Sequence, residues 1–588
     1  MGSIKIKDFF NGKFFEVPKY QRGYAWERQN IRDLFDDITE SIDSNSNHYI
    51  GTIVLSKDRD DEDKHYVVDG QQRITTISMI ISSIINHLED EDKSFYKRFY
   101  IKESNRFRLI CLNRDNKFFI DLLDGNLNLL TPENKSQRAL IDAINEINFK
   151  VKDIDNKLSF LKSIEKLEIM EFVENSEGDA IRIFQTVNDR GKPLSNMEKA
   201  KSLLIYFSNR YLEKELDIQI NDIFSDIFEI YDDIKQLGSK INVNLIKNKD
   251  FDEDSLMKYH FITYSNENYD PSSSYVLKYL KNKLTELRAN SNGDYSKLKT
   301  YIFKYTSSIK LFFESTKSLI LKADTQEKYY KLFSILQLSA TLYPLTIKLE
   351  MMQKLQEILF VKGNKVITVF DMIEIIDVRV YKTRGTDPKA DIARFTYEVE
   401  NKSNKEIFGW LMWFNNQWMP KHQFQSSLNS NIYGNRALNH IFISYCESVS
   451  KTSFSISDLK KITTDSDRIP SIEHILSQTP LFNPTALGFD DEKDYIDYEH
   501  KIGNLSLLER VLNSRVKNEV PIVKADTYSE SYFVMTQKLG SDIHTLKGFT
   551  KKNIIERTSI LSDYCSNNWW CETSTLLDDT EYSTLEEI

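Results

Sequence analysis

The long middle of this chain, from about residue 213 to residue 440, limits its fold more than any other feature. Its segments repeat apolar residues at helical spacing and contain few prolines or glycines, as in LKTYIFKYTSSIKLFFESTKSLILKA and YYKLFSILQLSATLYPLTIKLEMMQKLQEILF. A chain of 588 residues is also too long for one hydrophobic core. We therefore expect a helical middle domain with a further domain on each side.

The two flanking regions follow other patterns. Residues 1–212 hold compact β-branched segments, GTIVLS and HYVVDG, followed by a long apolar helix candidate, which predicts an α/β domain. Residues 441–588 begin with short segments and continue into a helix-rich end. The residues that break up these short segments are Pro470, Pro480, Pro484, Gly488 and Gly503. The predicted fold class is mainly α with α/β, in three domains: 1–212, 213–440 and 441–588.

Charge and cysteine content narrow the function classes. A formal net charge of -10 argues against a protein that coats nucleic acid, although a local basic cleft is compatible with it. Cys111, Cys446, Cys565 and Cys571 lack the spacing of a zinc site or a disulfide framework, which suits a reducing cytoplasm. The longest apolar runs fall short of the roughly 20 residues that a membrane span needs, and the N-terminus lacks a signal-peptide pattern. We expect a cytoplasmic protein with no membrane partner.

The segment YVVDGQQR, residues 66–73, is typical of an anion site between a strand and a helix. The turn and the first helical turn carry the candidate residues Asp69, Gly70, Gln71, Gln72 and Arg73. Backbone N–H groups at a helix start favour phosphate, Gly70 allows close approach, and Arg73 can add charge-assisted hydrogen bonds. The alternative is an ordinary turn with a polar helix cap.

A second candidate lies in FQTVNDRGKPLSNMEKAK, residues 184–201. Ser195 and Glu198 have capping-box spacing, so we expect a helix that begins near Asn196. The residues that this helix should bury are Met197, Ala200, Leu203, Leu204 and Phe207. The candidate site residues are Asn188, Asp189, Arg190, Gly191 and Lys192 on the preceding loop and Lys201 on the helix. They could close over phosphates or hold Mg²⁺ through Asp189, or simply cap and solvate the helix.

A third candidate, VPKYQRGYAWE, crowds aromatic and polar groups into residues 17–27. The side chains concerned are Tyr20, Gln21, Arg22, Tyr24 and Trp26. Such a mixture can stack on a base or line a recognition pocket, so we assign it to the sensing of DNA or of its modification. Packing of the aromatic rings in the core is the alternative.

Together these segments resemble the ParB-like nucleotide-hydrolysing domain at the N-terminus of GmrSD-type restriction enzymes. That pattern includes QRxYxW, DGQQR and FxxxNxRGxxLS, and all three occur here in order within about the first 210 residues. The resemblance implies binding and hydrolysis of a nucleoside triphosphate with Mg²⁺. It matches the nucleotide motif to Asp69, Gln71, Gln72 and Arg73, and the second loop to Asn188, Arg190 and Gly191. GTP, CTP, UTP and ATP all stay open as the nucleotide.

The C-terminal region contains SIEHILSQ, residues 471–478, and YEHKIGNLSLLERVLNSRVKN, residues 498–518. Glu473 and His474 sit in a β-prone stretch, a second strand is expected over Ile502–Leu508, and a helix over Glu509–Asn518. Such a ββα unit can hold a divalent ion between a carboxylate on the first strand and an Asn or His on the helix. A neutral His474 would deprotonate water while the metal offsets charge on the leaving oxygen.

This region resembles the HNH nuclease domain of GmrSD-type enzymes, with its EHIxxQ, HxxGNLxLL and NxxxxN elements followed by a Lys and a Tyr-x-x-Ser. The matching positions are Glu473 to Gln478, His500 to Leu508, Asn513, Asn518, Lys524, Tyr528 and Ser531. The resemblance makes His474 the general base and Asn504 the residue that orients it. It makes Glu473 a candidate metal ligand, with Asn513 or Asn518 as the helix ligand. Oxygen ligands favour Mg²⁺ or Mn²⁺ over zinc.

The two resemblances imply an anti-phage endonuclease of the type IV restriction kind, with a ParB-like domain, a helical middle and a ββα-metal HNH domain. We expect it to cleave double-stranded DNA, modified phage DNA in particular, under the control of nucleoside triphosphate. One active site per chain would need two visits or a homodimer to cut both strands. The alternatives are a nucleotide-dependent DNA-binding regulator, against which the intact Glu473, His474 and Asn504 weigh, and an RNase toxin, which substrate tests would separate.

Overall fold

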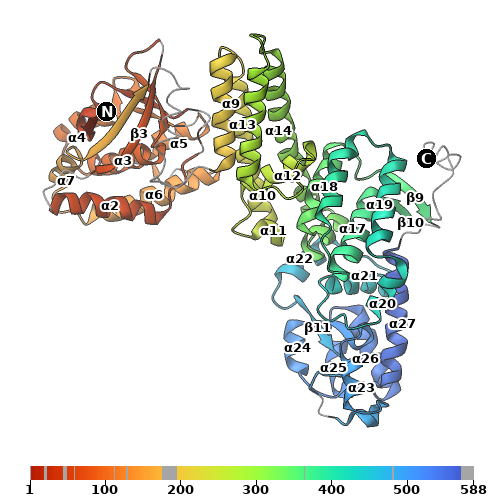
Figure 1. The fold of residues 1–588 in the computed structure, drawn as a ribbon. Helices are drawn as coiled ribbons and strands as arrows, with labels where there is room; N and C mark the ends of the chain where they lie inside the picture. Colours follow the sequence, from red (N-terminus) through yellow and green to blue (C-terminus); the bar gives the residue numbers. More distant parts are fainter. Residues whose placement is uncertain are drawn as a thin grey trace. The chain divides into compact units, whose positions relative to one another are not determined.

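The computed structural model describes residues 2–18, 21, 23–43, 49–58, 60–111, 113–127, 130–174, 195–362, 365–479 and 482–570 (Figure 1). Its contacts group into two compact units. Unit 1 comprises Met1–Asp232 and Leu277–Lys310, and unit 2 comprises Asp233–Val276 and Leu311–Ile588. Helices α10 (Asp217–Lys240) and α14 (Ser296–Thr325) contribute residues to both units. This grouping does not test the division into three domains, which stays a prediction.

Unit 1 contains a six-stranded mixed sheet with the strand order β1-β8-β3-β4-β2-β7. The strands are β1 (Gly2–Lys5), β2 (Phe14–Glu16), β3 (Tyr49–Lys57), β4 (Lys64–Asp69), β7 (Leu109–Ile110) and β8 (Glu168–Glu174). Strand β3 runs antiparallel to β4 and parallel to β8, and β2 runs parallel to both β4 and β7. A mostly helical chain with a mixed sheet confirms the predicted class, mainly α with α/β.

Helix α3 (Gln71–Ile85) is the central helix of unit 1. Its sequence QQRITTISMIISSII is apolar or small on every side, which is the composition of a helix surrounded by protein. It packs against α4 (Asp90–Tyr100), α5 (Asn113–Leu123), α6 (Lys135–Lys152) and α7 (Lys157–Ile164). The start of α3, where the anion site was predicted, is therefore held in a fixed place beside β4.

The region expected to be helical is helical, with one exception. Its helices include α12 (Glu253–Tyr264), α13 (Ser273–Ala289), α16 (Tyr343–Met351), α17 (Val369–Ile376), α18 (Lys389–Glu398), α19 (Asn404–Trp418) and α20 (Lys421–Leu428), and α9 (Asn196–Tyr211) comes just before it. The exception is the hairpin of β9 (Ile358–Lys362) and β10 (Lys365–Thr368), whose last residue Thr368 caps α17. Residues Asp377–Thr383 form a π-helix. Within the described ranges, no helix is both long and apolar enough to span a membrane.

The C-terminal part of unit 2 contains the predicted ββα arrangement. Strands β11 (Pro470–His474) and β12 (Leu505–Glu509) pair antiparallel, with His474 opposite Leu505, and α24 (Arg510–Val516) follows directly. The surrounding helices are α21 (Leu438–Ser450), α22 (Ile456–Thr464), α23 (Glu492–Glu499), α25 (Pro521–Ser529), α26 (Val534–Leu546) and α27 (Lys551–Asn568).

Two boundaries in this unit differ from the prediction. The second strand starts at Leu505 because Ile502–Asn504 form a 3₁₀ turn, in which Gly503 lies against α27. A Cβ on Gly503 would lie 2.2 Å from the carbonyl oxygen of Ile554. Helix α24 ends at Val516 because Lys517 leaves the helical conformation, with a positive φ of 44°.

Candidate functional site

His474, the last residue of β11, is joined to two residues at the end of α23. Its Nε2 atom lies 3.0 Å from Nδ1 of His500, and Nε2 of His500 lies 3.0 Å from Oε1 of Glu499. His474 is 7% exposed and His500 is partly exposed. His474 and His500, 26 positions apart in sequence, thus belong to one row of polar side chains that ends at Glu499.

The ring of His474 has polar neighbours at both of its nitrogens. Nε2 of His474 and Nδ1 of His500 share one hydrogen bond, in which either nitrogen is the donor depending on the tautomer. The amide nitrogen of Gln478 lies 3.1 Å from Nδ1 and 3.2 Å from Nε2 of His474, so it can donate to whichever ring nitrogen carries the lone pair. Burial, His500 and Lys524 together lower the pKa of His474 to about 4. His474 is therefore neutral near pH 7, as a general base requires.

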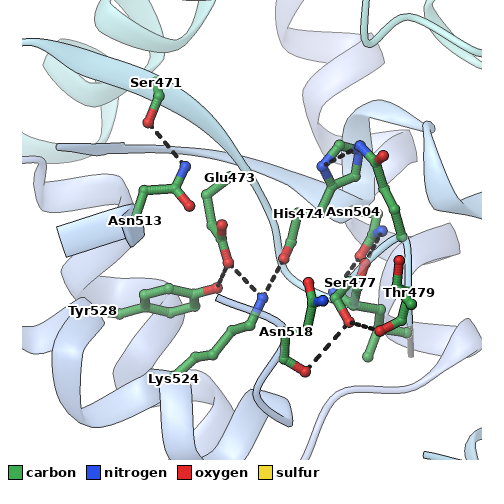
Figure 2. A network of polar contacts seen from close by, with 12 residues as sticks. Ser471, Glu473, His474, Ser477, Thr479, Asn504, Asn513, Asn518, Lys524 and Tyr528 are labelled. Carbon is green, nitrogen blue, oxygen red and sulfur yellow. Dashed lines mark hydrogen bonds and ion pairs between the residues drawn. The ribbon is translucent and has the colours of Figure 1, made fainter. Parts of the chain in front are cut away.

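Asn504 holds the backbone on both sides of this histidine pair. Its side chain is fully buried, donates to the carbonyl oxygens of Leu476 at 2.9 Å and Glu499 at 2.8 Å, and accepts from the Leu476 N–H at 2.9 Å. Figure 2 shows Asn504 next to the turn that follows His474. One side chain thereby positions the segments that carry His474 and His500, which suits the orienting role predicted for Asn504.

Glu473 belongs to a separate buried cluster. Its Oε1 atom accepts from Nζ of Lys524 at 2.6 Å and from the hydroxyl of Tyr528 at 2.8 Å, and Lys524 also donates to the carbonyl oxygen of His474 at 2.7 Å (Figure 2). All three side chains are more than nine-tenths buried. Burial raises the pKa of the Glu473 carboxyl, and the neighbouring Lys524 ammonium opposes that rise. Neighbouring strand residues point to opposite faces, so Glu473 and His474 leave β11 in different directions.

The residues predicted to hold a metal ion do not fit one as they are arranged. The ammonium of Lys524 occupies the place beside Glu473 that a cation would take, and the amide of Asn513 donates to Ser471 at 2.9 Å. Asn518 is exposed, and its carbonyl oxygen accepts from Ser477 at 3.5 Å. The described residues contain no group of three or more His, Cys, Asp or Glu side chains placed to bind a metal. The ligand assignment stays a prediction that this geometry does not support.

Sequence reasoning missed the partners of the two central residues. Glu499 and Gln478 stood inside the quoted motifs without an assigned role, as did His500. Motif spacing could have identified them as candidates, but it does not reveal that α23 returns to the end of β11. Lys524 and Tyr528 were noted only as matching positions, and their common contact with Glu473 depends on the packing of α25 against β11.

The strand–turn–helix predicted for the nucleotide motif is present in unit 1. Gly70 has a φ of +88°, and a Cβ there would lie 2.9 Å from Cγ1 of Ile53 and 3.1 Å from the Thr52 carbonyl oxygen, so the position requires glycine. Arg73 Nη1 donates to the same Thr52 oxygen at 3.0 Å. Burial raises the pKa of Asp69, against the effects of the Gly70 N–H and of Arg73.

The side chain of Gln72 links α3 to the aromatic segment. It accepts from the Ala25 N–H at 2.8 Å and donates to the Gly23 carbonyl oxygen at 3.2 Å. A cavity of about 20 Å³ adjoins this turn and has room for about one water molecule. Its lining includes Tyr24, Gln71, Gln72, Thr75, Asp115 and Ser136. Oδ2 of Asp115, a buried atom, has no hydrogen-bond partner among the described residues.

The described members of the aromatic segment pack against unit 1. Gln21 donates to the Val68 carbonyl oxygen at 2.7 Å. Tyr24 is 8% exposed with its hydroxyl 2.7 Å from Oγ1 of Thr76, and Trp26 packs against the core. Tyr20 and Arg22 lie outside the described residues. Core packing accounts for Tyr24, and the sensing role of the segment stays a prediction.

The second loop of the nucleotide motif, Asn188 to Gly191, also lies outside the described residues. The helix after it begins at Asn196 with the predicted capping box between Ser195 and Glu198, which confirms that expectation. Of the predicted buried residues, only Leu203 is partly exposed. Lys201 is 3% exposed, with its ammonium 5.9 Å from the ring of Phe228.

Comparison with known proteins gives two matches at the ends of the chain. Residues 6–205 match the family model of the GmrSD restriction endonuclease N-terminal domain, and residues 418–563 match that of the GmrSD restriction endonuclease C-terminal domain. A search of curated proteins gave no match. The two matched ranges contain the β4–α3 turn and the His474 cluster, respectively.

Proposed function

The chain belongs to the GmrSD family of type IV restriction endonucleases, and from that premise we propose that it hydrolyses DNA phosphodiester bonds with His474 as the general base. The observation that carries the proposal is the neutral, buried His474, which is hydrogen-bonded to His500, whose other ring nitrogen lies 3.0 Å from the Glu499 carboxylate. A base whose orientation is fixed by a second group, itself held by a carboxylate, is a recurrent arrangement in hydrolytic sites.

In the proposed reaction, the unprotonated ring nitrogen of His474 accepts a proton from water. The resulting hydroxide attacks phosphorus, the bond between phosphorus and the leaving sugar oxygen breaks, and that oxygen takes up a proton from bulk water. His474 stays hydrogen-bonded to His500, whose other nitrogen lies 3.0 Å from Glu499, so the carboxylate offsets the positive charge that forms on the imidazole pair. The Gln478 amide nitrogen lies 3.1 Å from Nδ1 and 3.2 Å from Nε2, so the attacking water would replace it beside the unprotonated nitrogen.

The divalent ion expected from the sequence, Mg²⁺ or Mn²⁺, stays part of the proposal on family grounds alone. Glu473 and Asn513 are engaged with Lys524 and Ser471, so no step of the reaction is assigned to a metal. Cleavage assays with added Mg²⁺, added Mn²⁺ and a chelator test the requirement directly.

We further propose that unit 1 binds and hydrolyses a nucleoside triphosphate at the β4–α3 turn and that this controls DNA cleavage. Support comes from Gly70 in its left-handed conformation, from Arg73 one turn later and from the family match over residues 6–205. Equilibrium binding of GTP, CTP, UTP and ATP to wild type and Arg73→Gln tests the site. If Arg73→Gln abolished nucleotide turnover and left DNA cleavage unchanged under every nucleotide condition, the control would be refuted.

The decisive experiment compares wild type, His474→Ala and His544→Ala on duplex DNA. His544 is an exposed histidine on α26 and serves as the matched control. Substrates are unmodified, hydroxymethylated, glucosylated and phosphorothioated DNA and a duplex RNA, each with and without every nucleoside triphosphate and with Mg²⁺. We expect cleavage of modified DNA by wild type and His544→Ala only. Nucleotide hydrolysis without any cleavage would favour the regulator, and cleavage of RNA alone would favour the toxin.

A further inference from the structure

Tyr433 contributes a third ring to the histidine pair from outside the ββα unit. Its ring lies parallel to that of His500, at an interplanar angle of 8° and a centroid distance of 5.2 Å. It also faces His474 at 4.4 Å with a tilt of 56°. The two imidazole rings lie 5.2 Å apart, so all three rings contact one another.

The loop that carries Tyr433, residues 429–437 between α20 and α21, is attached at two points. The N–H of Ile432 donates to the carbonyl oxygen of His500 at 3.1 Å. Nδ2 of Asn435 donates to Oγ1 of Thr383 at 3.1 Å, at the end of the π-helix, and its Oδ1 accepts from the Ala437 N–H at 2.7 Å. Tyr433 lies between these attachments and is 40% exposed, while Ile432 is buried.

The loop of residues 429–437 can control the orientation of the His500 ring. Both nitrogens of His500 are engaged at once, with His474 on one side and Glu499 on the other, and a rotation of the ring would break both contacts. A parallel ring against one face of an imidazole restricts that rotation, because stacked aromatic pairs have a preferred geometry. The backbone hydrogen bond from Ile432 fixes the same residue from its main chain.

We propose that Tyr433 is a positioning residue of the nuclease site, which holds His500 in line between His474 and Glu499 and links the site to the helical region through Asn435 and Thr383. This proposal rests on the function proposed for His474. Tyr433 acts through its ring, so phenylalanine should replace it, whereas alanine should not.

The first test measures single-turnover cleavage and DNA affinity separately for Tyr433→Ala and Tyr433→Phe. Tyr433→Ala should lower the cleavage rate by about tenfold or more, a fraction of the roughly 10²- to 10⁴-fold that general-base catalysis supplies. DNA affinity should stay at the wild-type value, and Tyr433→Phe should cleave at the wild-type rate. Tyr397→Ala, which removes a tyrosine of similar exposure on α18, is the matched control.

The second test does not depend on cleavage. Diethylpyrocarbonate modifies accessible histidines, and peptide mass spectrometry gives the rate at each one. His500 should react more slowly than the exposed His544 in wild type and Tyr433→Phe, and faster than in wild type once Tyr433 is replaced by alanine. The rate at His544 should be equal in all variants, which shows that the reagent dose is equal, and circular dichroism reports that the variants are folded.

The outcomes separate the two proposals. A wild type that does not cleave DNA refutes the function of His474, and the histidine modification rates still decide on Tyr433. Cleavage that is lost in His474→Ala but normal in Tyr433→Ala refutes the positioning role. If Tyr433→Ala lost DNA affinity by the same factor as cleavage rate, Tyr433 would be a DNA contact instead. If Tyr433→Phe lost as much cleavage rate as Tyr433→Ala, the hydroxyl and not the ring would carry the role.

Discussion

Two adjacent residues of β11 have opposite electrostatic surroundings. His474 is kept neutral by burial and by the nearby His500 and Lys524, whereas Glu473 is buried together with a cation. The two side chains leave the strand on opposite faces, so a single strand supplies both the proposed base and a buried ion pair. Each arrangement leads to a measurable expectation.

The pH dependence of cleavage should reflect the lowered pKa of His474. The base acts when unprotonated, and its pKa of about 4 lies below the ordinary 6.5, so the acid limb of kcat/KM should fall near pH 4. A pH–rate profile with recovery of activity at neutral pH as the stability control measures this. An acid limb near 6.5 would contradict the expectation.

The lowered pKa of His474 also makes the stability of the fold depend on pH. The unfolded chain binds a proton at His474 before the folded chain does, so the free energy of unfolding should decrease as the pH falls from 6.5 towards 4.

Replacement of Glu473 should destabilise the fold strongly. Glu473→Gln leaves the ammonium of Lys524, 1% exposed, without its counter-charge, and breaking a buried pair in this way costs about 3–5 kcal/mol. Urea denaturation measures the change. Glu530→Gln, which breaks the exposed pair with Arg515, is the control and should cost no more than about 1 kcal/mol. Equal effects in the two variants would show that burial does not matter here.

At the scale of elements, the sequence was informative where contacts are local. The β4–turn–α3 unit, the capping box before α9 and the ββα order of β11, β12 and α24 were all predictable, because each depends on spacing within one segment. The start of β12 was not predictable, because it depends on the contact of Gly503 with α27. The end of α24 was not predictable either, because it depends on the positive φ of Lys517. For the same reason the sequence pointed to His474 and Asn504 but not to their partners, which approach from other elements.

The contact between the 3₁₀ turn and α27 can be tested with one methyl group. In Gly503→Ala the new Cβ would lie 2.2 Å from the Ile554 carbonyl oxygen and 2.7 Å from the Thr558 nitrogen, so α27 would have to move. Overpacking of this kind costs about 1–3 kcal/mol or more. Thermal denaturation of the variant measures the loss.

Gly409→Ala is the matched control for that variant. Gly409 lies inside α19, and its Cβ would meet nothing within 4 Å, so alanine should stabilise the protein by about 0.5–1 kcal/mol. If the two glycine variants changed stability in the same direction, the close approach at Gly503 would not determine the outcome.

At the scale of the whole molecule, we expect the two units to unfold at different denaturant concentrations. Trp26 is the single tryptophan of unit 1, and the other five of the chain's six lie in unit 2: Trp410, Trp413, Trp418, Trp569 and Trp570. Intrinsic fluorescence therefore reports mainly on unit 2, whereas far-ultraviolet circular dichroism reports on both. The two denaturation curves should not coincide, which is the signature of unfolding that is not two-state. Coincident curves would show one cooperative unit.

The composition of these units could not be read from the sequence. Its pattern changes near residues 212 and 440, whereas the grouping by contacts assigns Leu277–Lys310 to unit 1 and Asp233–Val276 to unit 2. Helical periodicity identifies a helix and its buried face, but it does not say which neighbour covers that face. Long helices such as α10 and α14, which contribute to both units, have no break in their pattern at the division.

Dissolved salt should act differently on the two kinds of charge in this protein. The Glu473–Lys524 pair is out of reach of solvent ions, whereas exposed pairs and contacts with DNA phosphates are screened over about 8–10 Å at physiological ionic strength. Binding of DNA weakens steeply as salt rises, because counterions compete for the phosphates. The protein should therefore release nucleic acid at salt concentrations that leave its nuclease fold intact.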